Sequence, residues 1–250
     1  YVGLFHDLVG RKGVTPDTAR TIVRTNTTVI GALAVRRGDA DALICGLQGR
    51  FIKHARDIQS VIGLAEASSQ LSALSMLVMT RGVFFLADTY VNIDPSVDEL
   101  VAIALQARDH LRRFNIEAKA ALLSYSNFGS RDGLTSEKMR LVYERLQAVA
   151  PDLIVDGEMQ GDLAINADLR ERYVPDSVLR GEANLLIFPN LEAANLSMTL
   201  LKELNNALPV GPILMGTRQP AHILAPSVTS RGVVNMAAIA ATEALAGTGG

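Results

Sequence analysis

The sequence predicts an α/β protein in which a mostly parallel sheet lies between layers of helices, a three-layer αβα arrangement. Short apolar runs that end at glycine or proline alternate with longer segments of helical periodicity, a pattern typical of successive βαβ units. Hydrophobic residues make up 48% of the chain, which suits strands buried on both faces. The length of 250 residues is enough for one large domain or two small ones.

The first quarter of the chain is predicted to be mainly helical. Gly13 ends a first segment of helical spacing, and Thr15 before Pro16 then offers a helix N-cap with proline at the first helical position. The apolar run 29–35 fits either a helix or a strand. We expect helices over residues 1–12, 16–24 and 51–62, and a buried strand over 42–46 that ends at a glycine.

From residue 83 onward, strands and helices alternate regularly. Asp94-Pro95-Ser96 and Thr135-Ser136-Glu137 are start signals for two of the helices. We expect strands over 83–87, 120–124, 153–155, 185–188 and 213–215, the last of these being the final strand. We expect helices over 94–114, 135–149, 191–204 and 233–245.

Two features concern the organisation of the chain. Residues 65–75 are rich in Ala and Ser and are a candidate hinge between domains. The first clear strand comes only near Leu43, whereas a doubly wound domain normally opens on a strand. Because Tyr1 is also not a start methionine, we expect a fragment or processed product whose earlier, N-terminal βα units lie upstream.

Composition excludes several classes of protein. A net charge of −2 argues against a nucleic-acid surface. Cys45 is the only cysteine, so a disulfide framework and a cysteine metal site are excluded, and a reducing cytoplasm is expected. No apolar run approaches the roughly 18 residues of a membrane span, and charged residues near the amino end argue against a signal peptide.

The sequence lacks the common signatures of nucleotide and zinc sites. No Gly-x-Gly-x-x-Gly fingerprint, phosphate-binding loop or His-Glu-x-x-His motif occurs. The four histidines are scattered, and metal sites need convergent ligands. Carboxylates near strand ends could bind magnesium, but helix caps and turns use the same residues: Asp88, Asp94, Asp156, Glu158 and Asp162. We expect no metal site in this chain.

Two loops that follow buried strands could bind a ligand. The first begins Ser124-Tyr125-Ser126-Asn127-Phe128-Gly129-Ser130 and offers hydroxyl and backbone N–H groups to phosphate or carbonyl oxygens, although ordinary turn chemistry uses the same residues. The second starts at Gly216 and extends to Gly232. Its polar residues follow a strand end, where ligands of open α/β sheets bind: His222, Ser227, Thr229, Ser230 and Arg231.

Several motifs in order along almost the whole chain resemble the phosphate acetyl/butyryltransferase family. They are Arg11-Lys12-Gly13-Val14-Thr15, Gly38-Asp39-Ala40-Asp41-Ala42, Ala87-Asp88-Thr89-Tyr90-Val91-Asn92-Ile93-Asp94-Pro95, Leu123-Ser124-Tyr125-Ser126, Val155-Asp156-Gly157-Glu158-Met159-Gln160, Ile187-Phe188-Pro189-Asn190 and Gly211-Pro212-Ile213-Leu214. Four variants look most like one branch, the phosphotransacetylase-like C-terminal domain of bacterial NADP-dependent malic enzymes: Asp88-Thr89-Tyr90-Val91-Asn92, Ser126-Asn127-Phe128-Gly129-Ser130, Gly181-Glu182-Ala183-Asn184-Leu185 and Val234-Asn235-Met236.

This resemblance implies two αβα subdomains, as in the isocitrate and isopropylmalate dehydrogenases, with an acyl-CoA site between them that extends toward a dimer partner. We place subdomain I at residues 1–64 and 218–250 and subdomain II at 65–217. Active transferases of the family carry a Ser-Arg pair after the last strand and an Asp further along, thought to be the general base. A gapless match from Gly211 places Ala225, Pro226 and Gly232 at these positions.

Sliding Ser230-Arg231 onto the pair requires a gap, and the first carboxylate after it, Glu243, lies too far along to match. Arg56 matches a phosphate-binding arginine of the family. The threonine pair before it is replaced by Gly49-Arg50-Phe51, and a second family arginine falls near Val9 and is lost. Loss of a general base typically costs about 10²–10⁴-fold in rate, so little transfer activity is expected.

Our hypothesis is that the chain is a regulatory domain that binds acetyl-CoA as a negative effector, forms homo-oligomers and accompanies a malic enzyme catalytic domain in the same parent chain. NADP and Mg²⁺ or Mn²⁺ would belong to that catalytic domain. The alternatives are an active phosphate acetyltransferase and an assembly module without a ligand. No catalytic residue is assigned. The residues expected to line the acetyl-CoA cleft are Arg56, Ser126, Asn127, Phe128, Asn190, Arg218, Pro226, Ser227 and Arg231.

Overall fold

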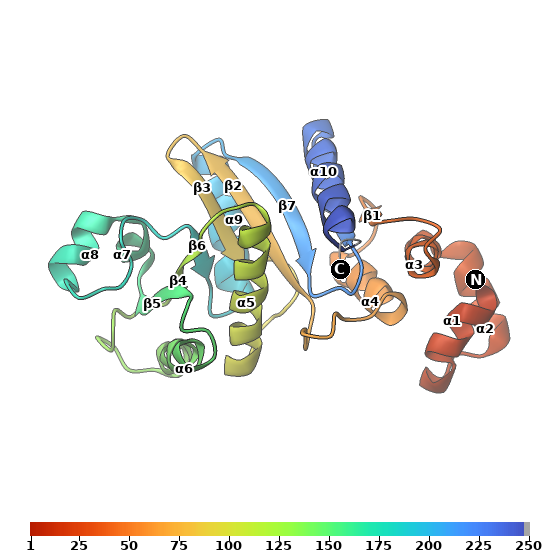
Figure 1. The fold of residues 1–250 in the computed structure, drawn as a ribbon, viewed down its shortest axis with the longest axis horizontal. Coiled ribbons are helices and arrows are strands. Elements are labelled where there is room, and N and C mark those ends of the chain that lie inside the picture. The colour runs from red at the N-terminus through yellow and green to blue at the C-terminus, as the bar shows by residue number, and fades with distance from the viewer. Residues whose placement is uncertain (248–250) are drawn as a thin grey trace. The chain divides into compact units, whose positions relative to one another are not determined.

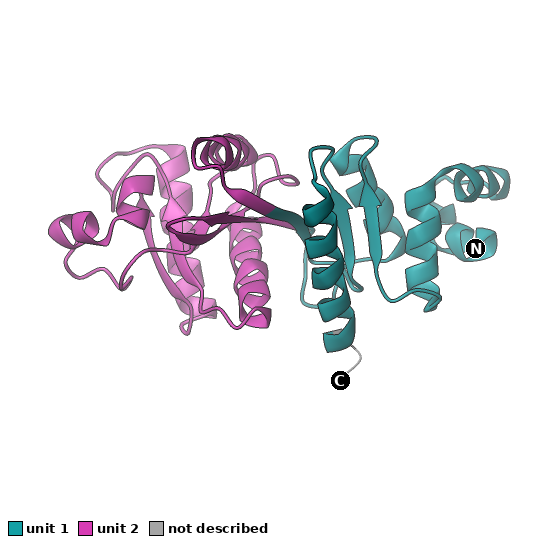
Figure 2. Cartoon of the chain, turned by 90° about the horizontal axis from the view of Figure 1, so that it is seen from above, with its two compact units in different colours: residues 1–71, 210–250 teal, residues 72–209 magenta. Residues whose placement is uncertain are grey.

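The structure, a computed structural model, describes residues 1–247, and these form two compact units (Figure 2). The first unit contains residues 1–71 together with the described residues from 210 onward, and the second contains residues 72–209. The chain therefore leaves the first unit once and returns to it.

The first unit is mainly helical around a short parallel sheet. Its strands, β1 (Leu43–Gly46) and β8 (Ala221–Leu224), pair in parallel, with Leu43 opposite Ala221. The helices of this unit are α1 (Val2–Val9), α2 (Pro16–Thr25), α3 (Thr27–Arg37), α4 (Phe51–Val61) and α10 (Ser230–Gly247), and a 3-10 turn, η1 (Gly10–Lys12), follows α1. Figure 1 shows β1 near α10 and α4.

The second unit is built on a six-stranded sheet with the order β5-β4-β6-β3-β2-β7 (Figure 1). Its strands are β2 (Ser72–Met79), β3 (Gly82–Ala87), β4 (Lys119–Leu123), β5 (Ile154–Met159), β6 (Leu185–Ile187) and β7 (Leu208–Met215), and β7 continues into the first unit. The pairs β3–β6, β6–β4 and β4–β5 are parallel, and β2–β3 is antiparallel. The predicted α/β class with a mostly parallel sheet is therefore confirmed.

Five helices connect these strands: α5 (Val97–Arg113), α6 (Leu134–Val149), α7 (Gly161–Ile165), α8 (Ala167–Tyr173) and α9 (Leu191–Leu204). Two of the three predicted start signals act as expected, but Thr135-Ser136-Glu137 does not cap a helix, because α6 begins at Leu134 directly after Gly133. Ser96 caps α5 in a capping box with Glu99, Asn190 caps α9, and Thr15 caps α2 in the first unit. The core of the unit joins apolar side chains of the strands, such as Phe84, to those of α7 and α9.

Some predicted elements need correction. Residues 29–35, which fitted either a helix or a strand, belong to helix α3. The unit boundary falls inside the predicted hinge, but the hinge ends at Leu71, because strand β2 starts at Ser72 and pairs with β3. Helices α7 and α8 were not predicted.

The prediction that 213–215 is the final strand is wrong, because β8 follows it. Strand β8 has only four residues, and it is stabilised by pairing with β1, which lies far away in the sequence. The same pairing shortens the loop that was expected from Gly216 to Gly232.

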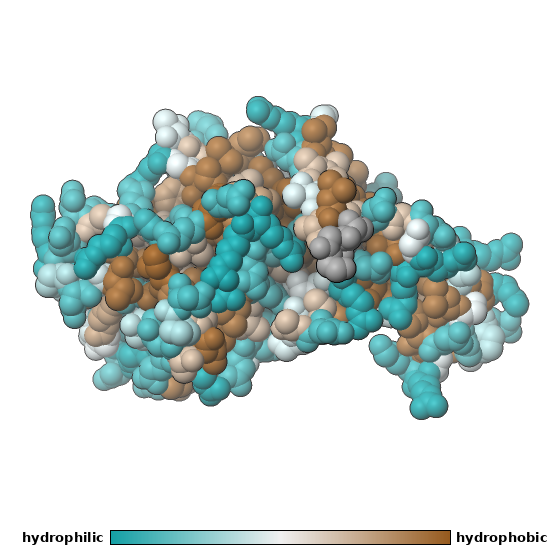
Figure 3. Space-filling model, viewed as in Figure 1, coloured by the Kyte–Doolittle hydropathy of each residue, from teal (hydrophilic) through white to brown (hydrophobic). Residues whose placement is uncertain are grey.

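Apolar side chains also occur on the surface. Figure 3 shows apolar residues along α10, where Val234 and Leu245 are exposed. On α9, the exposed side chains of Leu196, Leu200 and Leu204 recur every four residues and so lie on one face of the helix. In residues 1–247, no helix combines the length and the apolar character needed to cross a bilayer.

Candidate functional site

The four mutually parallel strands of the second unit, β3, β6, β4 and β5, end at the same edge of the sheet. Ligands of open α/β sheets bind beyond the carboxyl ends of such strands. The segments that follow these strands supply four of the nine predicted ligand residues, Ser126, Asn127, Phe128 and Asn190. We call this region the carboxyl edge, and it is formed by residues 88–96, 124–133, 160 and 188–190.

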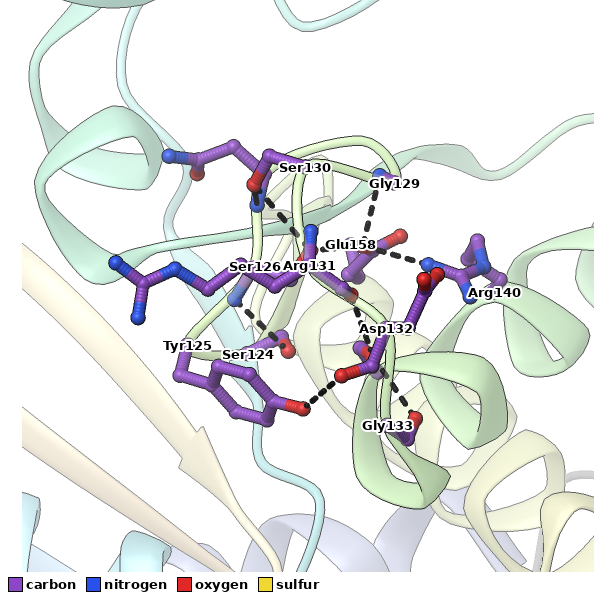
Figure 4. A network of polar contacts seen from close by, with 12 residues as sticks. Ser124, Tyr125, Ser126, Gly129, Ser130, Arg131, Asp132, Gly133, Arg140 and Glu158 are labelled. Carbon is purple, nitrogen blue, oxygen red and sulfur yellow. Dashed lines mark hydrogen bonds and ion pairs between the residues drawn. The ribbon is translucent and has the colours of Figure 1, made fainter.

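The loop 124–133 wraps around the buried carboxylate of Glu158 at the end of β5 (Figure 4). Ser126 Oγ donates to Glu158 Oε1 at 2.7 Å, the backbone N–H of Gly129 donates to the same oxygen at 2.9 Å, and Arg140 Nη1 lies 3.2 Å from it. Glu158 is 0% exposed, whereas the Arg140 side chain is 31% exposed. Arg140, on α6, thus supplies a positive charge to a carboxylate that has left water.

Further contacts tie this loop to itself and to its neighbour. Ser126 Oγ accepts a hydrogen bond from the backbone N–H of Arg131 at 3.1 Å. Asn127 exchanges two hydrogen bonds with Gln160, at 3.1 Å and 2.7 Å, which links the loops after β4 and β5. Phe128 has a positive φ of 47° and packs against the apolar core, so it combines an unusual backbone conformation with a buried contact.

Asp88 organises the segment after β3. Its Oδ1 accepts backbone N–H bonds from Ala73, Tyr90 and Val91, and its Oδ2 accepts from the backbone and side chain of Asn92. Burial raises the pKa of the Asp88 carboxyl above its ordinary value, and the hydrogen bonds lower it by less. This carboxylate therefore has a structural role in the turn, in agreement with the capping alternative considered from the sequence.

A cavity of about 740 Å³ lies at the carboxyl edge. Asn190 lines it, and so does Thr135 from the first turn of α6, directly after the loop 124–133. Both charged residues of the lining are acidic, which favours a neutral ligand group over a phosphate. The complete lining is Thr89, Tyr90, Ile93, Asp94, Thr135, Asn190, Leu191, Glu192, Asn195 and Leu196.

The other five predicted ligand residues belong to the first unit. Arg56 is exposed on α4, Arg218 is exposed after β7, and Arg231 is exposed in the first turn of α10. Pro226 and Ser227 are exposed in the short loop 225–229 between β8 and α10. The nine predicted ligand residues therefore fall into two sets, four in the second unit and five in the first.

The first turn of α10 is crowded at Gly232, the residue that the gapless match from Gly211 places at the family aspartate. A Cβ atom added to Gly232 would lie 2.7 Å from Val228 Cγ2 and 3.5 Å from Thr229 Oγ1. The first of these distances is shorter than a normal contact between carbon atoms. A larger side chain at residue 232 therefore requires Val228 to move.

His222 was expected in a ligand-binding loop, and this expectation is wrong. It lies in the middle of β8 and is 0% exposed. Its Nδ1 accepts a hydrogen bond from the backbone N–H of Leu214 at 3.2 Å, and its Nε2 lies 3.1 Å from Glu243 Oε2. The Glu243 side chain is 10% exposed, so this carboxylate joins α10 to β8 as a buried contact.

Other reactive groups are few in the described part of the chain. No group of three or more His, Cys, Asp or Glu residues could hold a metal ion among residues 1–247. Burial raises the pKa of Cys45 to about 11, so its thiol stays protonated at neutral pH and is a poor nucleophile.

Sequence reasoning missed the side chains that hold the carboxyl edge together. Glu158 and Gln160 lie in the family-like motif at residues 155–160. Their hydrogen bonds to residues 126–129, however, join segments about 30 positions apart in the sequence. Arg140 has no local signal, because a charged residue on an amphipathic helix normally faces water. The buried polar residues after strands β4 and β5 could have indicated such a network.

The chain is similar to a known protein family and to several known proteins. Residues 1–241 match the phosphate acetyl/butaryl transferase family. The chain is 56% identical over 243 residues to an NAD-dependent malic enzyme of Rhizobium meliloti and 47% identical over 240 residues to an NADP-dependent malic enzyme of Haemophilus influenzae. These matches cover 97% and 96% of this chain but 32% of either relative, so the chain spans about a third of their length.

A solved phosphotransacetylase from Streptococcus pyogenes has the same fold. The two structures superpose with a TM-score of 0.90 at 28% sequence identity, over 98% of this chain and 75% of that one. The resemblance inferred from the motifs is therefore confirmed, including the likeness to malic enzymes. The relatives include both NAD-dependent and NADP-dependent enzymes, so the preference for NADP stays a prediction.

Proposed function

We propose that this chain, which belongs to the phosphate acetyl/butaryl transferase family, is the regulatory and oligomerising domain of a malic enzyme, binds acetyl-CoA and has no transferase activity of its own. In this proposal the parent protein converts malate to pyruvate and CO₂ in the cytoplasm. Its catalytic domain, with NADP and Mg²⁺ or Mn²⁺, lies outside this chain. The likeness to malic enzymes over 96–97% of the chain supports this assignment.

The main support for the proposal comes from which residues occupy the loop 225–229 and the first turn of α10. Ala225 and Pro226 stand where active transferases have Ser and Arg, and Gly232 stands where they have Asp. A carboxylate side chain at residue 232 would require Val228 to move. Without a general base and a phosphate-binding arginine, acyl transfer loses its main chemical groups.

Ligand binding needs less than catalysis. The neutral pantetheine arm and acyl group of acetyl-CoA suit the cavity at the carboxyl edge, where amide and hydroxyl groups of Asn190, Asn195 and Thr135 lie beside apolar side chains. The phosphates of CoA require positive charge, and Arg56, Arg218 and Arg231 are exposed arginines that could supply it. Regulation follows if acetyl-CoA binds two states of the parent enzyme unequally.

The oligomerising role rests on exposed apolar surface. The leucine face of α9, formed by Leu196, Leu200 and Leu204, presents side chains that are 55%, 59% and 79% exposed. Apolar faces of this kind commonly mark protein–protein contacts. We expect a dimer or larger homo-oligomer, and substitution of two of these leucines by glutamate, as L196E/L200E, should lower the molar mass measured by light scattering.

Calorimetric titration of acetyl-CoA into the complete protein tests the proposed ligand. Binding should be saturable, and Arg218→Ala and Arg231→Ala should each weaken it, because each removes a charge that could contact phosphate. Arg24→Ala is the matched control, since Arg24 is an exposed arginine on α2 outside the predicted site. A titration without heat in the wild type at several temperatures would favour the assembly module that binds no ligand.

An assay for acetyl-CoA formation from acetyl phosphate and CoA tests the alternative of an active phosphate acetyltransferase. The fold shared with a solved phosphotransacetylase and the position of Ser230 and Arg231 at the start of α10 favour this alternative. We expect no turnover above background. Turnover that is lost in Arg231→Ala would overturn the regulatory assignment.

A further inference from the structure

Glu158 and Asp156 are both buried on strand β5, but their carboxylates are satisfied differently. Asp156 accepts at both oxygens, with Gly157 N–H on Oδ1 and Ser177 Oγ and Val178 N–H on Oδ2. In the described residues, all donors to Glu158 converge on Oε1, and Oε2 is buried without a hydrogen bond. A buried oxygen without a partner is destabilising, so its presence needs an explanation.

The three donors to Glu158 share Oε1, and they show which segment the carboxylate holds in place. Two of them, Ser126 Oγ and Gly129 N–H, belong to the loop 124–133, and the third is Arg140. The two loop donors are on either side of Asn127 and Phe128, so a single oxygen fixes both ends of this dipeptide. Phe128, held at a positive φ of 47°, lies within the constrained segment.

We infer that Glu158 is a positioning residue for ligand binding: it holds residues 126–129 in one conformation before the acyl-CoA ligand arrives, and Arg140 forms an ion pair with its carboxylate. The inference rests on the proposed function for the identity of the ligand. The geometry of the loop itself does not depend on that identity. A binding loop that is ordered in advance loses less conformational entropy when the ligand binds, which raises affinity.

The position of Arg140 fits this role. Its guanidinium is partly exposed, so it can reach solvent on one side and the Glu158 carboxylate on the other. Arg140 is on α6, whose first turn also contributes Thr135 to the cavity at the carboxyl edge. One helix therefore supplies both a wall of the cavity and the charge that neutralises Glu158.

Hydrogen–deuterium exchange in the absence of ligand tests the positioning directly. In the complete protein, Glu158→Gln should raise the exchange rate of the amides of residues 126–131 by about tenfold, because the charge-assisted bonds to Oε1 weaken. Asp156→Asn is the matched control. It changes a buried carboxylate on the same strand whose bonds go to Ser177 and Val178, so exchange should rise there and not in 126–131.

Calorimetry with acetyl-CoA gives the second readout. Glu158→Gln should raise the dissociation constant by about tenfold, and Asp156→Asn should leave it within about twofold of the wild type, although both variants lower the melting temperature. If Glu158→Gln does not fold, Arg140→Lys is the alternative test variant, because it keeps the positive charge at a partly exposed position. It should show the same two effects at smaller size.

The outcomes separate the two hypotheses. If the wild type does not bind acetyl-CoA, the proposed function fails, and the exchange data still decide the positioning role. Unchanged exchange in residues 126–131 of Glu158→Gln would overturn the inference. So would an equal loss of affinity in Asp156→Asn, because that result would indicate general destabilisation instead of positioning.

Discussion

Two loops of this protein follow parallel strands and carry predicted ligand residues, yet they are held in different ways. The loop 124–133 of the second unit forms hydrogen bonds with the buried carboxylate of Glu158, which Arg140 of α6 also contacts, and with Gln160. Within residues 1–247, the side chains of the loop 225–229 form hydrogen bonds no further away than the first turn of α10, where Gly232 N–H donates to Thr229 Oγ1 at 3.1 Å. Pro226 and Ser227 are exposed.

The difference between the two loops matches the two roles expected of them from the family resemblance, acyl transfer for the loop 225–229 and ligand binding for the loop 124–133. The loop 225–229 contains Ala225 and Pro226, which the gapless match from Gly211 places at the serine and arginine positions of active transferases. The loop 124–133 contains residues expected to bind the ligand, and it forms hydrogen bonds with Glu158 and Gln160. The contrast between the two loops agrees with the proposed function, in which ligand binding is kept and acyl transfer is lost.

The largest expected effect comes from breaking the ion pair that supports the loop 124–133. Arg140→Gln leaves Glu158 buried with a charge that only neutral donors satisfy, which should lower the free energy of unfolding by about 3 kcal/mol. Denaturant titration measures this loss. The double variant E158Q/R140Q removes both charges and should recover at least half of it. A double variant that is less stable than Arg140→Gln would contradict this account.

A second test concerns Asp88, which organises another segment of the carboxyl edge. Asp88→Asn places an amide group among donors of Asn92 and should cost about 2 kcal/mol at neutral pH. Measuring the free energy of unfolding of the wild type and of Asp88→Asn at several pH values tests whether folding raises the pKa of Asp88.

Burial raises the folded-state pKa of Asp88 above its unfolded value, so protonation of this group favours the folded state. Its contribution to stability is complete below the unfolded pKa and is lost as the pH rises through the folded pKa. The difference in unfolding free energy between wild type and Asp88→Asn should therefore grow from pH 7 to pH 4. A constant or shrinking difference would show that the hydrogen bonds outweigh burial.

The third prediction returns to the turn after the loop 225–229. Gly232→Asp should cost about 1–2 kcal/mol, because its Cβ would lie 2.7 Å from Val228 Cγ2. Adding Val228→Ala should relieve about half of the loss. Gly3→Asp is the control, since a Cβ on this helical glycine meets nothing within 4 Å. Thermal unfolding of the four proteins measures the comparison, and equal losses at residues 3 and 232 would argue against crowding.

The smallest effect is expected in the exposed loop itself. Ser227→Ala removes a hydroxyl that bonds to no other described residue and should change the free energy of unfolding by less than about 0.5 kcal/mol. Ser126→Ala, which removes the hydroxyl that donates to Glu158, should cost more, about 1–2 kcal/mol. Chemical denaturation of the two variants gives this difference directly. Equal effects would remove the contrast between the two loops.

Much of the fold could be predicted from local sequence signals. The caps of α2, α5 and α9 are at Thr15, Ser96 and Asn190, and the sequence predicts the first two of them. Long apolar runs such as that of β3 were recognised as strands. The segments that were missed are short or contain many small residues. Strand β2 begins Ser72-Ala73, and β8 has only four residues.

The candidate site was only partly predictable, for a similar reason. The polar loop after β4 could be identified along the chain. The buried Arg170 could not be predicted to hold the irregular segment around α7 and α8, although its guanidinium bonds to carbonyl oxygens of Leu163, Leu179 and Gly181. A charged side chain in a short helix gives no sign that it will be buried.

The sequence by itself determined the fold class and the family, because these depend on motifs and on the periodicity of apolar residues along the chain. Only the tertiary structure showed that His222 is buried in a strand and that Val228 lies close to Gly232. It also showed that Glu158 accepts hydrogen bonds from the loop 124–133. The physical reason is that local propensity acts between near neighbours in the chain. Strand pairing, crowding and buried charge compensation depend on residues that become neighbours only when the chain folds.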